Sequence, residues 1–213
     1  MTEQPDLSRC RLLDGFVPLL WDRAAGRLFL RIRNPGAELI YLDRLSHGLG
    51  DHRLERGNLS RPHLVRFERR GPRLLLTAAT TAWRSSSPEP AQQAAVRQAF
   101  AESVLWAFDI LDEADGLLVD ATAFLLRDAN SVAGMLSKLG EGPYVLDPAR
   151  CAIAEEGTGA FPLNSQVESL LTFTNPNATR LPFWFGNGQT EGLAAMAPDP
   201  RAITIRVRNC FVR

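Results

Sequence analysis

The chain consists largely of short apolar runs that are separated by turns rich in glycine and proline. The clearest pair, residues 64–68 and 73–78, flanks the turn Arg70-Gly71-Pro72. Polar and apolar residues alternate in the first run, which is typical of a strand with one buried face. Two such runs around a tight turn predict a β-hairpin. Because the pattern recurs along most of the chain, it limits the fold to one built mainly from hairpins.

The same pattern predicts further strands on both sides of this hairpin. They are expected at residues 16–21, 28–32, 38–42, 104–111, 117–126, 144–146, 151–154, 167–174 and 202–212. An Asp-Gly turn joins two of these runs after residue 111, which also favours a hairpin. Residues 46–58, with Gly48, Gly50 and Gly57, are expected to form a long ordered loop.

Two segments have helical features instead. Residues 91–102 follow Pro88-Glu89-Pro90, which favours a helix start. Residues 131–139 are preceded by Asp128 and Asn130, either of which could cap a helix, and are followed by Gly140.

Together these patterns predict a single domain, residues 1–213, of the α+β class. It is expected to be β-rich, with a mainly antiparallel sheet built from hairpins and two or three short helices. Residues 1–13 are predicted to be a flexible lead-in, and residues 179–195 an inserted loop.

The charge balance argues against two classes of partner. The chain has 24 Lys and Arg and 24 Asp and Glu residues. Without net charge, no overall field attracts nucleic acid or an anionic membrane. No apolar run approaches the roughly 18 to 20 residues of a membrane helix, and the first residues lack the apolar core of a signal peptide. Neither nucleic-acid binding nor a membrane span is therefore expected.

Metal-binding residues are scarce. The three histidines are His47, His52 and His63, and no HExxH motif is present. The five-residue spacing of His47 and His52 is not that of a helical zinc site. Solvated or hydrogen-bonded histidines are favoured, with a metal site that also uses Asp51 or Glu55 as the alternative. No cofactor is expected in this chain.

A group of acidic residues could in principle bind calcium. Asp109, Asp112, Glu113 and Asp115 lie around the second hairpin turn, but their spacing differs from the known calcium loop. Solvated carboxylates at a hairpin tip are the favoured interpretation.

Nucleophiles have no supporting motif either. The sequence contains no G-x-S-x-G elbow, no phosphate-binding glycine loop and no C-x-x-C among Cys10, Cys151 and Cys210. One disulfide with a free thiol and three buried thiols are both open for these cysteines. An independent hydrolytic site around Asp120, Glu102 and His63 remains an alternative hypothesis.

The most unusual segment holds three consecutive aromatic residues, Phe183, Trp184 and Phe185, between proline and an Asn-Gly pair. A loop that packs these rings onto the core is favoured. The alternative is an exposed aromatic platform that makes the chain a binding module.

The last strand has a regular alternation. Ile203, Ile205 and Val207 share one face and are predicted to be mostly buried. The chain ends shortly after Phe211, which suggests an open sheet edge at a domain border. Phe211 is therefore expected near an apolar surface that meets a further domain.

Six blocks carry a family resemblance. They are residues 14–22 (DGFVPLLWD), 65–72 (VRFERRGP), 100–108 (FAESVLWAF), 118–129 (LVDATAFLLRDA), 167–173 (VESLLTF) and 198–206 (PDPRAITIR). In this order they resemble the uncharacterised domain that precedes the catalytic domain of exported bacterial zinc-dependent metalloproteases. The resemblance extends from about Asp14 to the end of the chain.

The resemblance implies a non-catalytic accessory domain that packs against a downstream metalloprotease domain or shapes its cleft. In that family the metzincin-like HExxH helix and its zinc lie downstream, so no catalytic or zinc-binding residue carries over to this chain. Peptide or protein substrates would be met only through the full-length protein, in the periplasm or outside the cell. Phe183, Trp184, Phe185 and Phe211 are the candidate interaction residues.

Overall fold

The computed structural model describes residues 6–58, 60–83, 85–178 and 192–213. These residues contain one sheet of twelve strands in which all strand pairs are antiparallel. The strands are β1 (Arg11–Leu13), β2 (Leu19–Asp22), β3 (Arg27–Ile32), β4 (Glu38–His47), β5 (His63–Arg70), β6 (Arg73–Ala78), β7 (Ser103–Asp112), β8 (Leu117–Asp120), β9 (Val145–Leu146), β10 (Ala152–Ala160), β11 (Asn164–Thr174) and β12 (Ala202–Val212).

The same residues form three α-helices, α1 (Pro90–Ala99), α2 (Thr122–Leu125) and α3 (Val132–Lys138), and the short 3-10 turns η1 (Leu7–Arg9), η2 (Pro148–Arg150) and η4 (Ala194–Met196). The prediction of a β-rich, mainly antiparallel sheet with short helices is confirmed. The helices contribute less than is usual in an α+β domain. None of the helices in the described part of the chain has the length and hydropathy of a membrane span.

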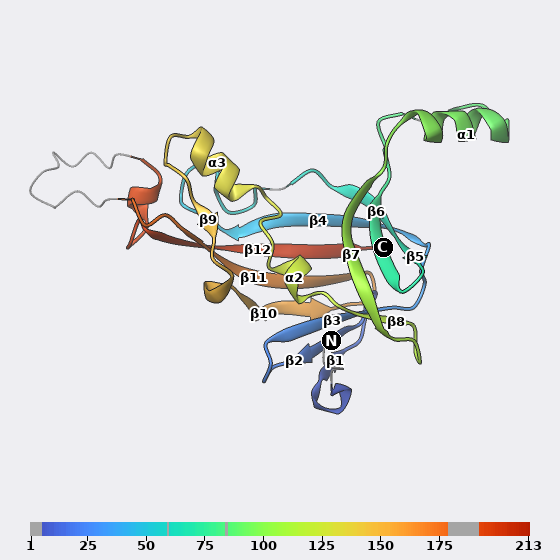
Figure 1. The fold of residues 1–213 in the computed structure, drawn as a ribbon, viewed down its shortest axis with the longest axis horizontal. Coiled ribbons are helices and arrows are strands. Elements are labelled where there is room, and N and C mark those ends of the chain that lie inside the picture. Colours follow the sequence, from blue (N-terminus) through green and yellow to red (C-terminus); the bar gives the residue numbers. More distant parts are fainter. Residues whose placement is uncertain (1–5, 59, 84, 179–191) are drawn as a thin grey trace, which may run out of the picture.

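The order of the strands is β1-β2-β3-β8-β7-β6-β5-β4-β12-β11-β10, and β9 pairs with β11. The sheet curves so strongly that its two ends, β1 and β10, come close to each other (Figure 1), and Arg11 of β1 pairs with Glu155 of β10 at 3.3 Å. Phe16 donates a backbone hydrogen bond of 2.8 Å to the carbonyl of Phe161. The Ser165 hydroxyl accepts from the amide of Val17 at 3.0 Å and donates to its carbonyl at 2.7 Å. Loop and side-chain contacts therefore join the two ends of the sheet.

Phe124 of α2 lies at the centre of the core. Its ring contacts Tyr41, Trp106, Phe108 and Phe211 at centroid distances of 5.4, 5.9, 5.5 and 6.4 Å. These residues come from three strands, β4, β7 and β12, so this one helical turn connects both halves of the curved sheet. In Figure 1, α2 lies in front of β11 and β12.

The hairpins are confirmed, but one predicted strand is too long. The strand predicted at residues 117–126 ends at Asp120, and α2 follows. Asp120 Oδ1 accepts hydrogen bonds from the amide of Thr122 at 2.9 Å and from its hydroxyl at 2.6 Å. This side-chain bonding turns the backbone out of the strand, as Asp does at helix starts.

Part of the predicted flexible lead-in has regular structure. Residues Arg11–Leu13 form β1, which pairs with β2, and η1 precedes them. Asp6 caps η1 by accepting from the amide of Ser8 at 3.1 Å. Of the predicted inserted loop, residues 179–191 lie outside the described part, and η4 follows shortly after them.

The last strand is not at an edge. β12 lies between β4 and β11 and pairs with both along most of its length. The expected burial of Ile203, Ile205 and Val207 is confirmed, since they are 0, 0 and 1% exposed. The expectation of an open edge was wrong because strand order depends on which distant strands pair, and β4 and β11 each contribute a long partner.

Residues 79–102 leave the sheet between β6 and β7 and carry α1, which stands away from the sheet (Figure 1). At the base of this excursion Trp83 stacks on Phe100, with ring centroids 5.3 Å apart and planes 7° from parallel. Trp83 is nevertheless 60% exposed. The helix predicted at residues 91–102 is present as α1, but it ends at Ala99, three residues earlier than predicted.

Candidate functional site

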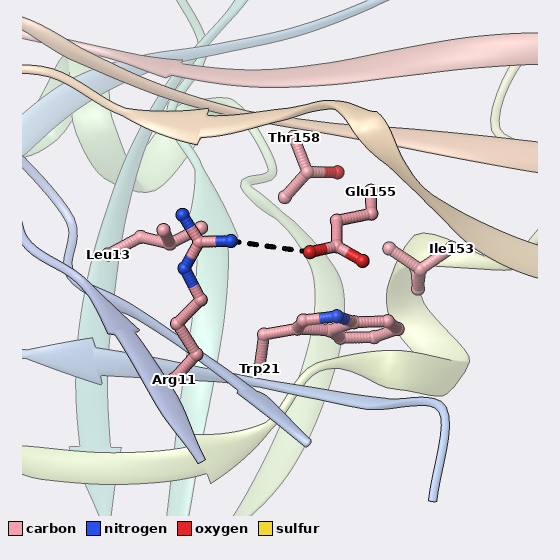
Figure 2. A pocket seen from close by; sticks show the side chains of 6 residues that line it. All are labelled: Arg11, Leu13, Trp21, Ile153, Glu155 and Thr158. Atoms are coloured by element: carbon pink, nitrogen blue, oxygen red, sulfur yellow. Dashed lines mark hydrogen bonds and ion pairs between the residues drawn. The ribbon is translucent and has the colours of Figure 1, made fainter. Parts of the chain in front are cut away.

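A pocket of about 120 Å³ lies where the two ends of the sheet face each other. Figure 2 shows its walls, which come from two regions more than a hundred residues apart in sequence. The lining residues are Arg11 and Leu13 of β1, Trp21 of β2, and Ile153, Glu155 and Thr158 of β10. The curvature of the sheet, rather than any local motif, creates this pocket.

Some polar groups of the pocket have hydrogen-bond or ion-pair partners, and one has none among the described residues. Glu155 Oε1 pairs with Arg11 at 3.3 Å, and Glu155 Oε2 pairs with Arg23 at 3.4 Å. Thr158 donates its hydroxyl to the carbonyl of Ala154 at 2.7 Å. Trp21 Nε1 is buried and has no hydrogen-bond partner among the described residues. The pocket therefore combines a free donor with a carboxylate, a chemistry suited to binding a polar group.

A second surface feature surrounds the end of β12. Ile40, Phe161 and Leu163 are 39, 47 and 64% exposed, and the half-buried Val212 pairs with Ile40 on the neighbouring strand. In the sheet register Val212 is opposite both Ile40 and Asn164, and the amide of Arg213 donates to the carbonyl of Leu163 at 3.0 Å. We call Ile40, Phe161, Leu163 and Val212 the C-terminal apolar patch. Side chains gathered in this way are typical of an interaction surface.

Of the four predicted interaction residues, only Phe211 lies in the described part of the chain. Phe211 is 0% exposed, and its ring packs against Tyr41, Phe67 and Phe124 in the core. Alternate residues of a strand point to opposite faces, so Phe211 points inward while its neighbour Val212 points outward. The expectation that Phe211 itself lies near the surface is therefore wrong, although the apolar surface near the chain end is present. Phe183, Trp184 and Phe185 lie outside the described residues.

The residues of the alternative hydrolytic site are not brought together. Asp120 Oδ2 pairs with Arg27 at 2.7 Å, and Glu102 Oε2 pairs with Arg66 at 2.7 Å. The register of β7 with β8 places Asp120 across from residues near Phe108, which is roughly 20 Å along the strand from Glu102. His63 begins β5 opposite Tyr41.

The candidate metal ligands are also dispersed. Within the described ranges, no three His, Cys, Asp or Glu side chains gather in a metal-binding arrangement. The side chain of His52 is 80% exposed and lies 3.5 Å from Asp51, whereas His47 is at the end of β4. Near the β7–β8 turn, three of the acidic residues each face an arginine instead of one another, as the pairs Asp109–Arg73, Glu113–Arg69 and Asp115–Arg31.

The three cysteines are free thiols. Burial is the largest influence on each and raises the pKa of Cys10, Cys151 and Cys210. A raised pKa lowers the thiolate fraction at neutral pH, and the thiolate is the reactive form. Burial therefore favours the protonated thiol at all three positions.

A buried polar network fixes the α2–α3 connection to the sheet. Arg127 donates to the Tyr41 hydroxyl at 3.0 Å, and that hydroxyl donates to Asn209 Oδ1 at 2.6 Å. Burial is the largest influence on Tyr41 and raises the pKa of its hydroxyl, which keeps the group protonated as a donor. The Arg127 guanidinium also lies 3.8 Å from the centroid of Phe124. This network extends the core and holds α2 in place.

No sequence motif marks the residues of the pocket. Trp21 and Ile153 were each placed in a predicted strand, which gave no sign that they would meet. The apolar run at residues 16–21 could have marked Trp21 as a core residue. No local signal connects it to Glu155, because their proximity depends on the curvature of the whole sheet.

The comparisons with known proteins identify a family. Searches among curated proteins and among solved structures found no match. A family model, DUF5117, described as a domain of unknown function, matches residues 57–213. The match begins in the loop after β4, yet β4 lies between β5 and β12 in the sheet, so the earlier residues are part of the same fold. Since the model covers well over half of the sequence, the chain belongs to the DUF5117 family.

Proposed function

We propose that this chain is a non-catalytic accessory domain of an exported bacterial zinc-dependent metalloprotease, and that it packs against the protease domain through the C-terminal apolar patch. The resemblance of the six sequence blocks supports the choice of partner. In this proposal the zinc, its HExxH ligands and the peptide substrate belong to the protease domain, and the full-length protein acts in the periplasm or outside the cell.

The observation that carries the proposal is the patch at the end of β12. Ile40 and Val212 are neighbours on adjacent strands, and both project from the outer face of the sheet. Phe161 and Leu163 are exposed apolar residues of the turn between β10 and β11, which reaches the end of the chain through the backbone hydrogen bond from Arg213 to Leu163. Removing such side chains from water is favourable by roughly 25 cal/mol for each Å² buried. A partner domain that covers the patch would therefore gain affinity from it.

The first test is the coding region that follows Arg213. It is expected to encode a domain with an HExxH motif in the same reading frame. That domain and the present chain, produced as separate polypeptides, should associate in isothermal titration calorimetry. If no metalloprotease domain is encoded beside this chain, or if the two polypeptides do not associate, the proposal is wrong.

A matched pair of variants locates the contact. Leu163 is 64% exposed in the patch, and Val145 is 61% exposed on β9. Leu163→Asp should weaken the association about tenfold or more, because an unpaired charge would be buried in an apolar contact. Val145→Asp should leave it unchanged, and neither variant should alter the thermal unfolding of the isolated chain. Equal effects of the two variants on association would exclude the patch as the contact.

A further inference from the structure

We infer that the pocket between the two ends of the sheet binds a planar amide group, the chemistry shared by a peptide backbone and by Asn and Gln side chains. The inference rests on the pocket alone and does not depend on the proposed association with a protease. It makes this region a peptide-binding site in addition to any domain contact.

The first argument is the indole of Trp21. The residue is 8% exposed, and its Nε1 atom is buried without a hydrogen-bond partner among the described residues. Buried indole N–H groups normally have an acceptor. In Figure 2 the nitrogen-bearing edge of the ring faces the pocket, below Glu155 and beside Arg11. A ligand in this pocket would therefore gain by presenting an acceptor to Trp21.

The second argument is the carboxylate of Glu155. Each of its oxygens has one arginine partner, and both arginines are mostly exposed, with side-chain exposures of 67% for Arg11 and 83% for Arg23. A carboxylate can accept about four hydrogen bonds, so Glu155 retains free acceptor capacity. An amide offers both matching groups, since its carbonyl can accept from Trp21 and its N–H can donate to Glu155.

The same groups disfavour other ligands. A carboxylate would satisfy Trp21, but it would bring a second negative charge next to Glu155 and would have to compete with Glu155 for Arg11 and Arg23, which already pair with that side chain. An alkyl group would fit the apolar walls formed by Leu13 and Ile153 but would leave the Trp21 donor unpaired. An amide is therefore the group that can pair with both the Trp21 donor and the Glu155 acceptor.

Size and strand order favour a peptide. The volume of about 120 Å³ is well below the range of about 300 to 1,000 Å³ that is typical for whole small-molecule ligands. The pocket therefore fits one peptide unit or one side chain. Among the described strands, β1 pairs only with β2 and β10 only with β11, so an extended peptide could continue along either edge by backbone hydrogen bonding.

The test follows the indole N–H signals of the ¹⁵N-labelled chain by NMR. Trp21→Phe identifies the Trp21 signal by its loss. Two uncharged probes represent the two sources of the amide, N-methylacetamide for the backbone and propionamide for the side chain. At least one is expected to move the Trp21 signal saturably, with a dissociation constant on the order of millimolar, as is usual for fragments of this size. The probe with the tighter binding identifies the source.

Propionate is the matched control, since it has the size of propionamide but carries a charge. It should move the Trp21 signal at least about fivefold less than the amide at equal concentration, because Glu155 repels it. If neither amide moves the signal, or if propionate moves it as much as the amides, the inference is overturned.

Variants test the two polar groups through the methyl signals of Leu13 and Ile153, which remain when the indole is changed. Trp21→Phe keeps an aromatic ring but removes the N–H, and Glu155→Ala removes the acceptor. Each should weaken amide binding at least about fivefold, whereas Trp83→Phe, far from the pocket, should not. Should Trp21→Phe not fold, Glu155→Ala decides the test, because the Glu155 side chain is 39% exposed and its loss leaves the core intact. Wild-type amide binding by Glu155→Ala would contradict the inference.

Discussion

The curved sheet and the excursion at residues 79–102 differ in what stabilises them. In the sheet, Phe124 alone contacts four aromatic rings from three strands. In the excursion, α1 stands away from the sheet, and the main ring contact is the exposed stack of Trp83 on Phe100 (Figure 1). Both regions have a local sequence pattern that predicts their elements. The two regions differ in how extensively they are packed. We therefore expect the sheet to unfold as one unit and the excursion to open locally with a smaller free-energy change.

The largest expected effect tests the centre of the sheet. Phe124→Ala should lower the free energy of unfolding by about 3–5 kcal/mol, because a buried phenyl ring is lost and a cavity remains. The loss should be measured by urea denaturation. Trp83→Ala, which removes an exposed ring in the excursion, should cost no more than about 1 kcal/mol. Similar losses in the two variants would remove the distinction between the regions.

The next largest effect on the free energy of unfolding is expected from removing the charge of one acidic side chain in each region. Glu168 of β11 has only 4% side-chain exposure and pairs with Arg208 at 3.1 Å and with Arg206 at 3.5 Å. Because the arginines are partly exposed, Glu168→Gln should cost about 1–3 kcal/mol of unfolding free energy, less than for a fully buried pair. In the excursion, the Glu102 side chain is 37% exposed and pairs with Arg66. Glu102→Gln should therefore lower the free energy of unfolding by at most about 1 kcal/mol.

The pH dependence of the Glu168 contribution has a definite sign. Burial alone would raise the pKa of Glu168, but the nearby Ser46 hydroxyl and the guanidiniums of Arg208 and Arg206 outweigh burial and lower it. A carboxyl group with a lowered folded pKa stabilises the fold above its unfolded pKa, and this contribution disappears as the pH falls through the folded pKa. The difference between the wild type and Glu168→Gln should therefore be full above about pH 4.3, the usual glutamate pKa, and should shrink in stronger acid. A difference that grows in acid would contradict this assignment.

The smallest effect tests the independence of the excursion. Ala95 is an exposed residue in α1, and glycine there should destabilise the helix by up to about 1 kcal/mol. Amide hydrogen exchange in α1 should accelerate accordingly, while the urea midpoint of the whole chain stays unchanged. A lower midpoint would mean that α1 is part of the cooperative core.

The successes and failures of prediction have separate physical causes. The hairpin around Gly71 and the cap of α3 by Asp128, which accepts from the amides of Val132 and Ala133 at 2.8 and 3.0 Å, depend on neighbours in sequence. Both were predictable. The central position of β12 and the pocket between Trp21 and Glu155 depend on strands far apart in sequence, so no local pattern contained them.

By itself, the sequence determined the β-rich composition of the fold, most of its hairpins, and the buried face formed by Ile203, Ile205 and Val207, because alternation and turn chemistry act over a few residues. The tertiary structure decided that Phe211 points into the core and that Val212 beside it joins an exposed apolar patch. It also decided that the two ends of the sheet meet around the Trp21 indole, whose N–H has no hydrogen-bond partner in the described part of the chain. These outcomes follow from strand order and curvature, which only the simultaneous packing of the whole chain can set.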